Sequence, residues 1–168
     1  MKRPLVLFFT LVVLTIISAE DYVEKLAHSL SMTREDVQQC IGKTDATPED
    51  IMHFDQIVLD NLQTVDFDEQ ALRIGCFLTC LSQKSEIMYG ASMNVEKLKL
   101  FVRSKAKEPN PDMIAIVYQT LDMCNDRVKS KTNECEVSFK FLLCFIKEMR
   151  RLDENKTQRP YENTIDNE

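Results

Sequence analysis

The sequence predicts an all-α domain held by disulfides, and three observations lead to this prediction. The chain of 168 residues contains only three glycines, and long stretches consist of residues that favour helices. Apolar residues recur along these stretches at helical spacing. The six cysteines are an even number, which favours three disulfides in a chain that enters an oxidising compartment.

The first 19 residues are typical of a secretory signal peptide. A basic start precedes an apolar run over residues 5–17, and Ile17-Ser18-Ala19 suits cleavage. The run of about 13 residues is shorter than the roughly 20 that span a bilayer. We therefore expect a secreted, extracellular protein without membrane insertion, with a helical domain over residues 20–152 and a polar C-terminal tail over residues 153–168.

The charge balance is acidic. The whole chain has a formal net charge of −6 at pH 7, and removal of the two basic residues in the signal peptide leaves about −8. Non-specific binding to nucleic acid or to an anionic membrane requires basic patches, so the sequence predicts no nucleic-acid partner.

Helix signals in the first half of the chain are consistent with three helices. Residues 21–29 carry apolar side chains at helical spacing, and Thr33 is placed to cap a second helix that ends near Ile41. Thr47-Pro48-Glu49-Asp50 combines an N-cap, a proline at the first helical position and acidic residues in the first turn. The apolar face of the helix that follows is formed by Ile51, Phe54, Ile57, Val58 and Leu62.

The central helix is predicted over residues 66–84. Apolar residues occupy most of its circumference over residues 74–81, so we expect it to be buried. It carries Cys76 and Cys80, whose Cβ atoms on one helix face would lie about 5–6 Å apart. Because a disulfide requires about 3.5–4.5 Å, each of the two must bond elsewhere.

The second half of the chain begins with an expected apolar turn over residues 87–90. Asn94 can cap a short helix, and Asn110-Pro111 can begin the next one. A basic loop is expected over residues 127–132, followed by a last long helix over residues 133–152.

The cysteines alone leave several pairings open. Six cysteines allow 15 pairings. Helix geometry excludes Cys76 with Cys80, and also Cys135 with Cys144, which are nine residues apart and so about 13 Å apart along one helix. Ten pairings remain. No metal or cofactor is expected, because the two histidines, His28 and His53, lack the spacing of metal ligands.

The spacing C-x35-C-x3-C-x43-C-x10-C-x8-C resembles that of the insect odorant-binding protein family, the pheromone-binding and general odorant-binding proteins. The match runs from about Asp21 to Ile146, and its most specific parts are C-x3-C and C-x8-C. Further residues that support the resemblance are Thr47-Pro48-Glu49-Asp50-Ile51, Phe77, Glu86-Ile87-Met88 and Phe145.

The resemblance implies a compact bundle of six helices around an internal apolar pocket, held by three interlocked disulfides. The implied bonds are Cys40–Cys80, Cys76–Cys135 and Cys124–Cys144. It also implies a carrier that binds and transports small hydrophobic molecules, such as odorants, pheromones or other semiochemicals, through an aqueous extracellular fluid. The implied partners are this ligand and, indirectly, a membrane olfactory receptor, and the chain is expected to be a monomer or weak homodimer.

Seven apolar residues are candidates for the wall of the pocket, although periodicity alone equally allows them to be core. Adaptable methionine and aromatic side chains suit lipid-like or volatile ligands. The candidates are Phe54, Met88, Phe101, Tyr118, Phe139, Phe145 and Met149. Asn155-Lys156-Thr157 is a sequon for glycosylation at Asn155.

The sequence does not predict an enzyme, because it contains no glycine-rich phosphate loop and leaves no cysteine free as a nucleophile. Two alternatives to an odorant carrier remain. One keeps the fold and is a salivary or seminal protein that sequesters amines or lipids. The other is a secreted helical signalling protein that acts through its surface and has a solid core.

Overall fold

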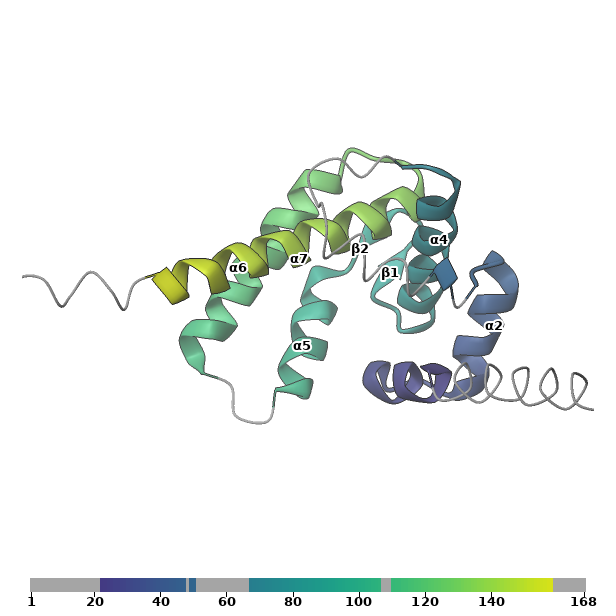
Figure 1. The fold of residues 1–168 in the computed structure, drawn as a ribbon, viewed down its shortest axis with the longest axis horizontal. Coiled ribbons are helices and arrows are strands. Elements are labelled where there is room, and N and C mark those ends of the chain that lie inside the picture. The colour runs from purple at the N-terminus through teal and green to yellow at the C-terminus, as the bar shows by residue number, and fades with distance from the viewer. Residues whose placement is uncertain (1–21, 48, 51–66, 107–109, 159–168) are drawn as a thin grey trace, which may run out of the picture.

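The computed structural model describes residues 22–47, 49–50, 67–106 and 110–158. This part of the chain is almost entirely helical (Figure 1), which confirms the predicted all-α class. The predicted signal peptide and the predicted apolar face between Ile51 and Leu62 lie outside the described residues.

The N-terminal part contains two helices that meet at a sharp turn. Residues 22–30 are helical, and Ser31 follows with a left-handed φ of 55°. Helix α2 (Arg34–Thr44) begins after the predicted cap Thr33, whose hydroxyl accepts a hydrogen bond from the amide of Asp36 at 3.1 Å. It continues beyond the expected end near Ile41 to Thr44.

Helix α4 (Glu69–Lys84) packs against α2 on one side and the last helix on another, whereas α6 (Pro111–Val128) packs on the last helix and α5 (Val95–Lys105) on α6. The cap of α4 is Asp68, whose carboxylate accepts from the amide of Ala71 at 2.8 Å. Helix α2 lies against one side of α4, and the last helix, α7 (Glu134–Gln158), shares the largest interface with it (Figure 1). Ile74, Phe77 and Leu81 are buried, as predicted for the stretch that is apolar around its circumference.

A small hairpin replaces the apolar turn expected over residues 87–90. Strand β1 (Met88–Tyr89) pairs antiparallel with β2 (Ser92–Met93). Gly90 adopts a positive φ of 53° between them, a conformation that glycine reaches without steric cost. Glycine therefore allows the chain to reverse and form the second strand, which the apolar pattern alone did not indicate.

The remaining helices begin at the predicted caps. Asn94 precedes α5 (Val95–Lys105) and accepts from the amide of Lys97 at 3.0 Å. Asn110 precedes α6 (Pro111–Val128) and accepts from the amide of Asp112 at 2.9 Å. Local side-chain capping thus places these helix starts as the sequence indicates.

Two helix ends extend beyond their predicted positions. Helix α6 continues to Val128, so the first residues of the expected basic loop are helical. Helix α7 continues past Leu152 to Gln158, so the predicted polar tail also begins as helix. Asn155 of the sequon lies in this extension, and its glycosylation stays a prediction.

Three disulfides connect the helices in series. The bonded pairs are Cys40–Cys80 between α2 and α4, Cys76–Cys135 between α4 and α7, and Cys124–Cys144 between α6 and α7. These are the pairs that the family resemblance implies. Because each bond restricts the unfolded chain, the three together stabilise the folded helical domain.

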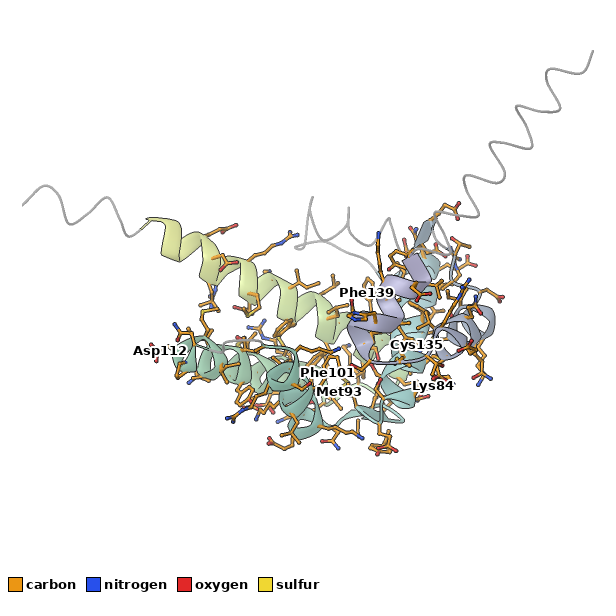
Figure 2. All side chains as sticks on the ribbon, turned by 90° about the horizontal axis from the view of Figure 1, so that it is seen from below. Lys84, Met93, Phe101, Asp112, Cys135 and Phe139 are labelled. Carbon is orange, nitrogen blue, oxygen red and sulfur yellow. A yellow bond between two sulfur atoms is a disulfide. The ribbon has the colours of Figure 1, made fainter. Side chains whose placement is uncertain are left out.

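The apolar interior consists of three clusters of buried residues. The first joins helix 22–30, α2 and α4, and its members include Val23, Val37 and Phe77. The second joins β1, α5, α6 and α7, and includes Met88 and Leu121. A third, smaller cluster lies between α4 and α7. Figure 2 shows Cys135 and Phe139 at that α4–α7 end of the molecule, while Asp112 lies at the opposite end.

None of the helices in the described part of the chain combines the length and the apolar character required to cross a membrane.

Candidate functional site

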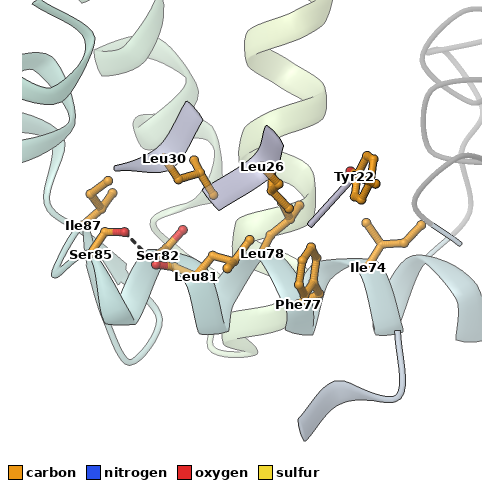
Figure 3. A pocket seen from close by; sticks show the side chains of 10 residues that line it. All are labelled: Tyr22, Leu26, Leu30, Ile74, Phe77, Leu78, Leu81, Ser82, Ser85 and Ile87. Carbon is orange, nitrogen blue, oxygen red and sulfur yellow. Dashed lines mark hydrogen bonds between the residues drawn. The ribbon is translucent and has the colours of Figure 1, made fainter. Parts of the chain in front are cut away.

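A cavity of about 230 Å³ lies between helix 22–30 and α4 (Figure 3). Two helical stripes form most of it. From helix 22–30, side chains spaced four residues apart face the cavity, and from α4 a stripe at spacings of three and four faces them. The lining residues are Tyr22, Leu26, Leu30, Ile74, Phe77, Leu78, Leu81, Ser82, Ser85 and Ile87.

The lining is mostly apolar, with two serine hydroxyls at one end and the Tyr22 side chain towards the other. Figure 3 shows Ser82 and Ser85 near Ile87, while Phe77 and Ile74 lie towards the other end of the α4 stripe. The Ser85 hydroxyl donates to the backbone oxygen of Leu81 at 2.9 Å. Its oxygen retains capacity to accept, so this end can bind one polar group of a mainly apolar molecule.

The volume of the cavity favours a small ligand. Pockets for drug-sized ligands have volumes of about 300–1,000 Å³. A buried apolar cavity of about 150 Å³ already binds benzene. The volume of about 230 Å³ lies between these values. No charged side chain is among the ten lining residues, so the chemistry suits a neutral molecule.

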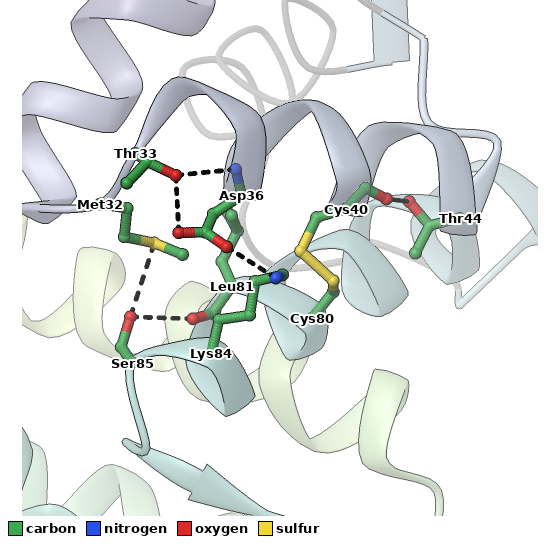
Figure 4. The surroundings of a disulfide bond; sticks show 9 residues. All are labelled: Met32, Thr33, Asp36, Cys40, Thr44, Cys80, Leu81, Lys84 and Ser85. Carbon is green, nitrogen blue, oxygen red and sulfur yellow. Dashed lines mark hydrogen bonds and ion pairs between the residues drawn. A yellow bond between two sulfur atoms is a disulfide. The ribbon is translucent and has the colours of Figure 1, made fainter.

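One disulfide and an ion pair fix the α4 wall to α2 (Figure 4). The Cys40–Cys80 bond lies one turn from Lys84, whose ammonium donates to the carboxylate of Asp36 at 2.7 Å. Lys84, together with the Thr33 hydroxyl, holds the pKa of Asp36 below its usual range. Asp36 is therefore ionised at neutral pH and keeps this contact with α4.

The opposite side of α4 is fixed to α7 by buried polar contacts. The Thr79 hydroxyl lies 2.9 Å from the backbone oxygen of Glu134 and 2.7 Å from the Ser138 hydroxyl. Ser138 in turn donates to the sulfur of Met88 at 3.1 Å. These contacts satisfy hydroxyl groups that would be costly to bury unpaired, and they fix α4 between the cavity and α7.

The residues predicted as pocket walls lie elsewhere in the described structure. Met88 and Phe139 are each 1% exposed and belong to the buried clusters. Tyr118 and Phe145 are half-buried and pack against the second cluster. Phe101 is half-buried on α5.

Met149 is likewise half-buried, on α7, whereas Phe54 lies outside the described residues. None of the six described candidates is among the ten residues that line this cavity. Their contact with a ligand stays a prediction.

The apolar pattern of the lining residues on α4 is visible in the sequence, but it predicts burial of the helix and does not predict a cavity. Apolar residues occupy most of the circumference of α4 between Ile74 and Leu81, a pattern that indicates burial rather than a cavity. Likewise, Tyr22, Leu26 and Leu30 repeat at intervals of four residues, a spacing that indicates a helix and nothing more. A pattern of this kind shows which face is apolar, but not whether the opposing face fills the space.

The fold, the three disulfides and the apolar cavity are those of a helical binding protein, and sequence comparison places the chain in a family. The model of the PBP/GOBP family matches residues 22–148, and the chain belongs to this family, as the cysteine spacing suggested.

The chain is also similar to curated relatives from Solenopsis species. It is 22% identical over 121 residues to pheromone-binding protein Gp-9 of Solenopsis globularia littoralis, covering 71% of this chain and 75% of the relative. The protein of the same name from Solenopsis geminata is also 22% identical over 121 residues, with 71% and 76% covered. That from Solenopsis invicta is 21% identical over the same length and coverage. No solved structure matches the chain.

Proposed function

We propose that this protein is a secreted carrier of small, neutral, hydrophobic molecules, such as odorants or pheromones. The observation that carries the proposal is the apolar cavity between helix 22–30 and α4. Membership of the PBP/GOBP family supports it, as do relatives named as pheromone-binding proteins. Secretion is supported by the signal-peptide pattern of residues 1–19 and by three disulfides, which form in oxidising compartments.

Binding in this proposal is the transfer of apolar ligand surface from water into the cavity. Such transfer is favourable by about 25 cal/mol per Å² of apolar area removed from water, before the costs of association. The ligand also restores van der Waals contacts that the cavity wall lacks when empty. The three disulfides help the fold to tolerate this empty space, and no chemical step is required of the protein.

The composition of the cavity wall bears on the choice between odorant-like molecules and amines. A carboxylate near the ammonium group is one way in which a protein compensates the charge of a bound cationic amine. The ten lining residues contain no aspartate and no glutamate. This supports a neutral, mainly apolar ligand, such as an alcohol, aldehyde or ester.

The carrier proposal is tested with the fluorescent hydrophobic probe N-phenyl-1-naphthylamine. Ser82→Phe introduces a large side chain at the polar end of the cavity, and Ser130→Phe makes the same change at an exposed position as the matched control. We expect Ser82→Phe to weaken probe binding about tenfold or more, equivalent to about 1.4 kcal/mol. The control should bind the probe as the wild type does.

Circular dichroism establishes that both variants retain the wild-type helix content. Displacement of the probe is then measured with a panel of neutral alcohols, aldehydes, esters and hydrocarbons. Wild-type protein that shows no saturable, displaceable binding across the panel would contradict the carrier function. Equal affinities of the two variants would exclude this cavity as the binding site.

A further inference from the structure

A lysine from α5 holds the C-terminal end of helix 22–30. The ammonium of Lys105 donates to the backbone oxygen of His28 at 3.3 Å and to the hydroxyl of Ser31 at 2.6 Å. The same ammonium lies 5.5 Å from the centroid of the Phe101 ring, one helical turn earlier on α5. Two oxygen acceptors and an aromatic face therefore surround one cation.

The end of a helix is a favourable place for this cation. The last carbonyl groups of a helix lack helical partners and carry partial negative charge. Here the amides of Ser31 and Met32 turn back to the oxygens of His28 and Ala27, at 3.3 and 2.9 Å, as the chain leaves the helix. Lys105 supplies a further donor and a positive charge at the same point.

This contact joins two parts of the molecule that have separate apolar clusters. Helix 22–30 packs through Val23 and Ala27 into the cluster with α2 and α4. Helix α5 packs through Leu98 and Val102 against the cluster with α6 and α7. Lys105 bridges the two elements across 77 residues of sequence to His28, so it ties helix 22–30 to the C-terminal half of the fold.

The tied end of helix 22–30 is also one end of the cavity. Leu30, which directly precedes Ser31, lines the cavity, and Figure 3 shows it across from Ile87 and Ser85. A movement of this helix end away from α4 would open the space between Leu30 and Ser85. The contacts of Lys105 therefore affect how fast a bound ligand dissociates.

We propose that Lys105 is a positioning residue for ligand binding, which holds helix 22–30 in place as one wall of the cavity and so slows release of the ligand. This inference rests on the carrier function proposed above. The contact is solvent-exposed, and exposed charged contacts have modest effects. We therefore expect its loss to raise the dissociation rate constant of a bound probe about two- to fivefold.

The experiment measures dissociation of N-phenyl-1-naphthylamine by stopped-flow fluorescence. Lys105→Met removes the charge but retains an unbranched apolar side chain. Lys129→Met is the matched control, because Lys129 pairs with Asp126 at 2.9 Å in an exposed ion pair within the α6 region. Faster release from Lys105→Met, with release from Lys129→Met unchanged, is the expected result.

A second variant tests whether Lys105 acts through Ser31. Ser31→Gly removes the hydroxyl acceptor and suits the positive φ at this position. We expect it to release the probe faster than the wild type, and the double variant to release it no faster than Lys105→Met alone. Strictly additive effects of the two substitutions, or equal release from Lys105→Met and Lys129→Met, would overturn the proposal.

Hydrogen exchange without ligand separates this proposal from the carrier function. The amide of Met32 is bonded to the oxygen of Ala27 at the tied helix end, so it should exchange faster in Lys105→Met than in Lys129→Met, at an unchanged urea midpoint. Equal exchange at Met32 overturns the role of Lys105 whether or not the probe binds. Absence of displaceable probe binding by the wild type contradicts the carrier function instead.

Discussion

The close approach of α4 and α7 at Gly75 gives a sharp prediction about stability. A Cβ atom at this position would lie 2.3 Å from the backbone oxygen of Cys135 and 3.0 Å from its carbonyl carbon. It would also lie 3.2 Å from the Cβ of Phe139. Because the nearest atoms belong to the backbone of α7, Gly75→Ala requires the start of that helix to move.

Several bonds oppose this movement. The disulfide between Cys76 and Cys135 joins the two helices at this point, with a Cα–Cα distance of 4.3 Å. The Thr79 hydroxyl lies 2.9 Å from the backbone oxygen of Glu134, which a shift would separate. Helix α7 can therefore move away from Gly75 only by straining or breaking these contacts.

The expected magnitude combines three contributions. Overpacking of a close contact costs up to about 3 kcal/mol. Loss of one hydrogen bond adds about 1 kcal/mol. Replacement of glycine by alanine inside a helix offsets about 1 kcal/mol through helix propensity. We expect Gly75→Ala to lower the free energy of unfolding by about 3 kcal/mol.

Gly42→Ala is a control with the opposite sign. Gly42 lies in α2, and no heavy atom lies within 4 Å of a Cβ built there. This substitution should raise the free energy of unfolding by about 0.5–1 kcal/mol through helix propensity alone. Equilibrium urea unfolding with the disulfides intact measures both variants. A Gly75→Ala variant as stable as Gly42→Ala would refute the close approach of the two helices.

Two further predictions concern Asp50 and the third disulfide. The guanidinium of Arg73 bonds both carboxylate oxygens of Asp50, at 2.9 and 3.0 Å, so Asp50→Asn should lower the free energy of unfolding by about 1–3 kcal/mol at pH 7. Because Arg73 holds the pKa of Asp50 well below its usual range, this stabilisation is complete above the unfolded-state pKa of about 3.9 and decreases as the pH falls below it. Urea unfolding at pH 7 and pH 3 should show that the difference in free energy of unfolding between Asp50→Asn and the wild type is smaller at pH 3, and a larger difference at pH 3 would contradict the role of Arg73. The control Asp126→Asn, at an exposed ion pair, should change the free energy of unfolding by less than about 0.5 kcal/mol at either pH. Replacement of both Cys124 and Cys144 by alanine removes a disulfide that closes a loop of 20 residues, and should lower the free energy of unfolding by about 3 kcal/mol in the same assay. A loss near zero would show that this bond contributes little to the stability of the fold.

Helix starts could be predicted because capping is a local interaction. Thr33, Asn94 and Asn110 each accept a hydrogen bond from an amide two or three residues along the chain, so a short stretch of sequence contains the information. Helix ends were less predictable. Helix α7 continues to Gln158 through polar residues, because no glycine or proline stops it before that point.

The disulfide pairing required more than local reasoning. Helix geometry excluded two pairs and left ten arrangements, since the cysteine spacing does not show which helices are neighbours. The family resemblance supplied one arrangement. The packing of α2 and α7 on α4, and of α6 on α7, brings those cysteines together.

The sequence by itself determined the helical class, the positions of most helices and the family of the chain. Periodicity, helix caps and cysteine spacing are patterns of residue order, so they can be recognised without knowing which helices are neighbours. The tertiary structure alone decided where the cavity lies. Met88 and Phe139 are as apolar as Leu26 and Leu78, yet the first two are enclosed by core and the latter two face open space. This difference depends on how closely opposing helices approach each other, which no single helix can encode in its own pattern.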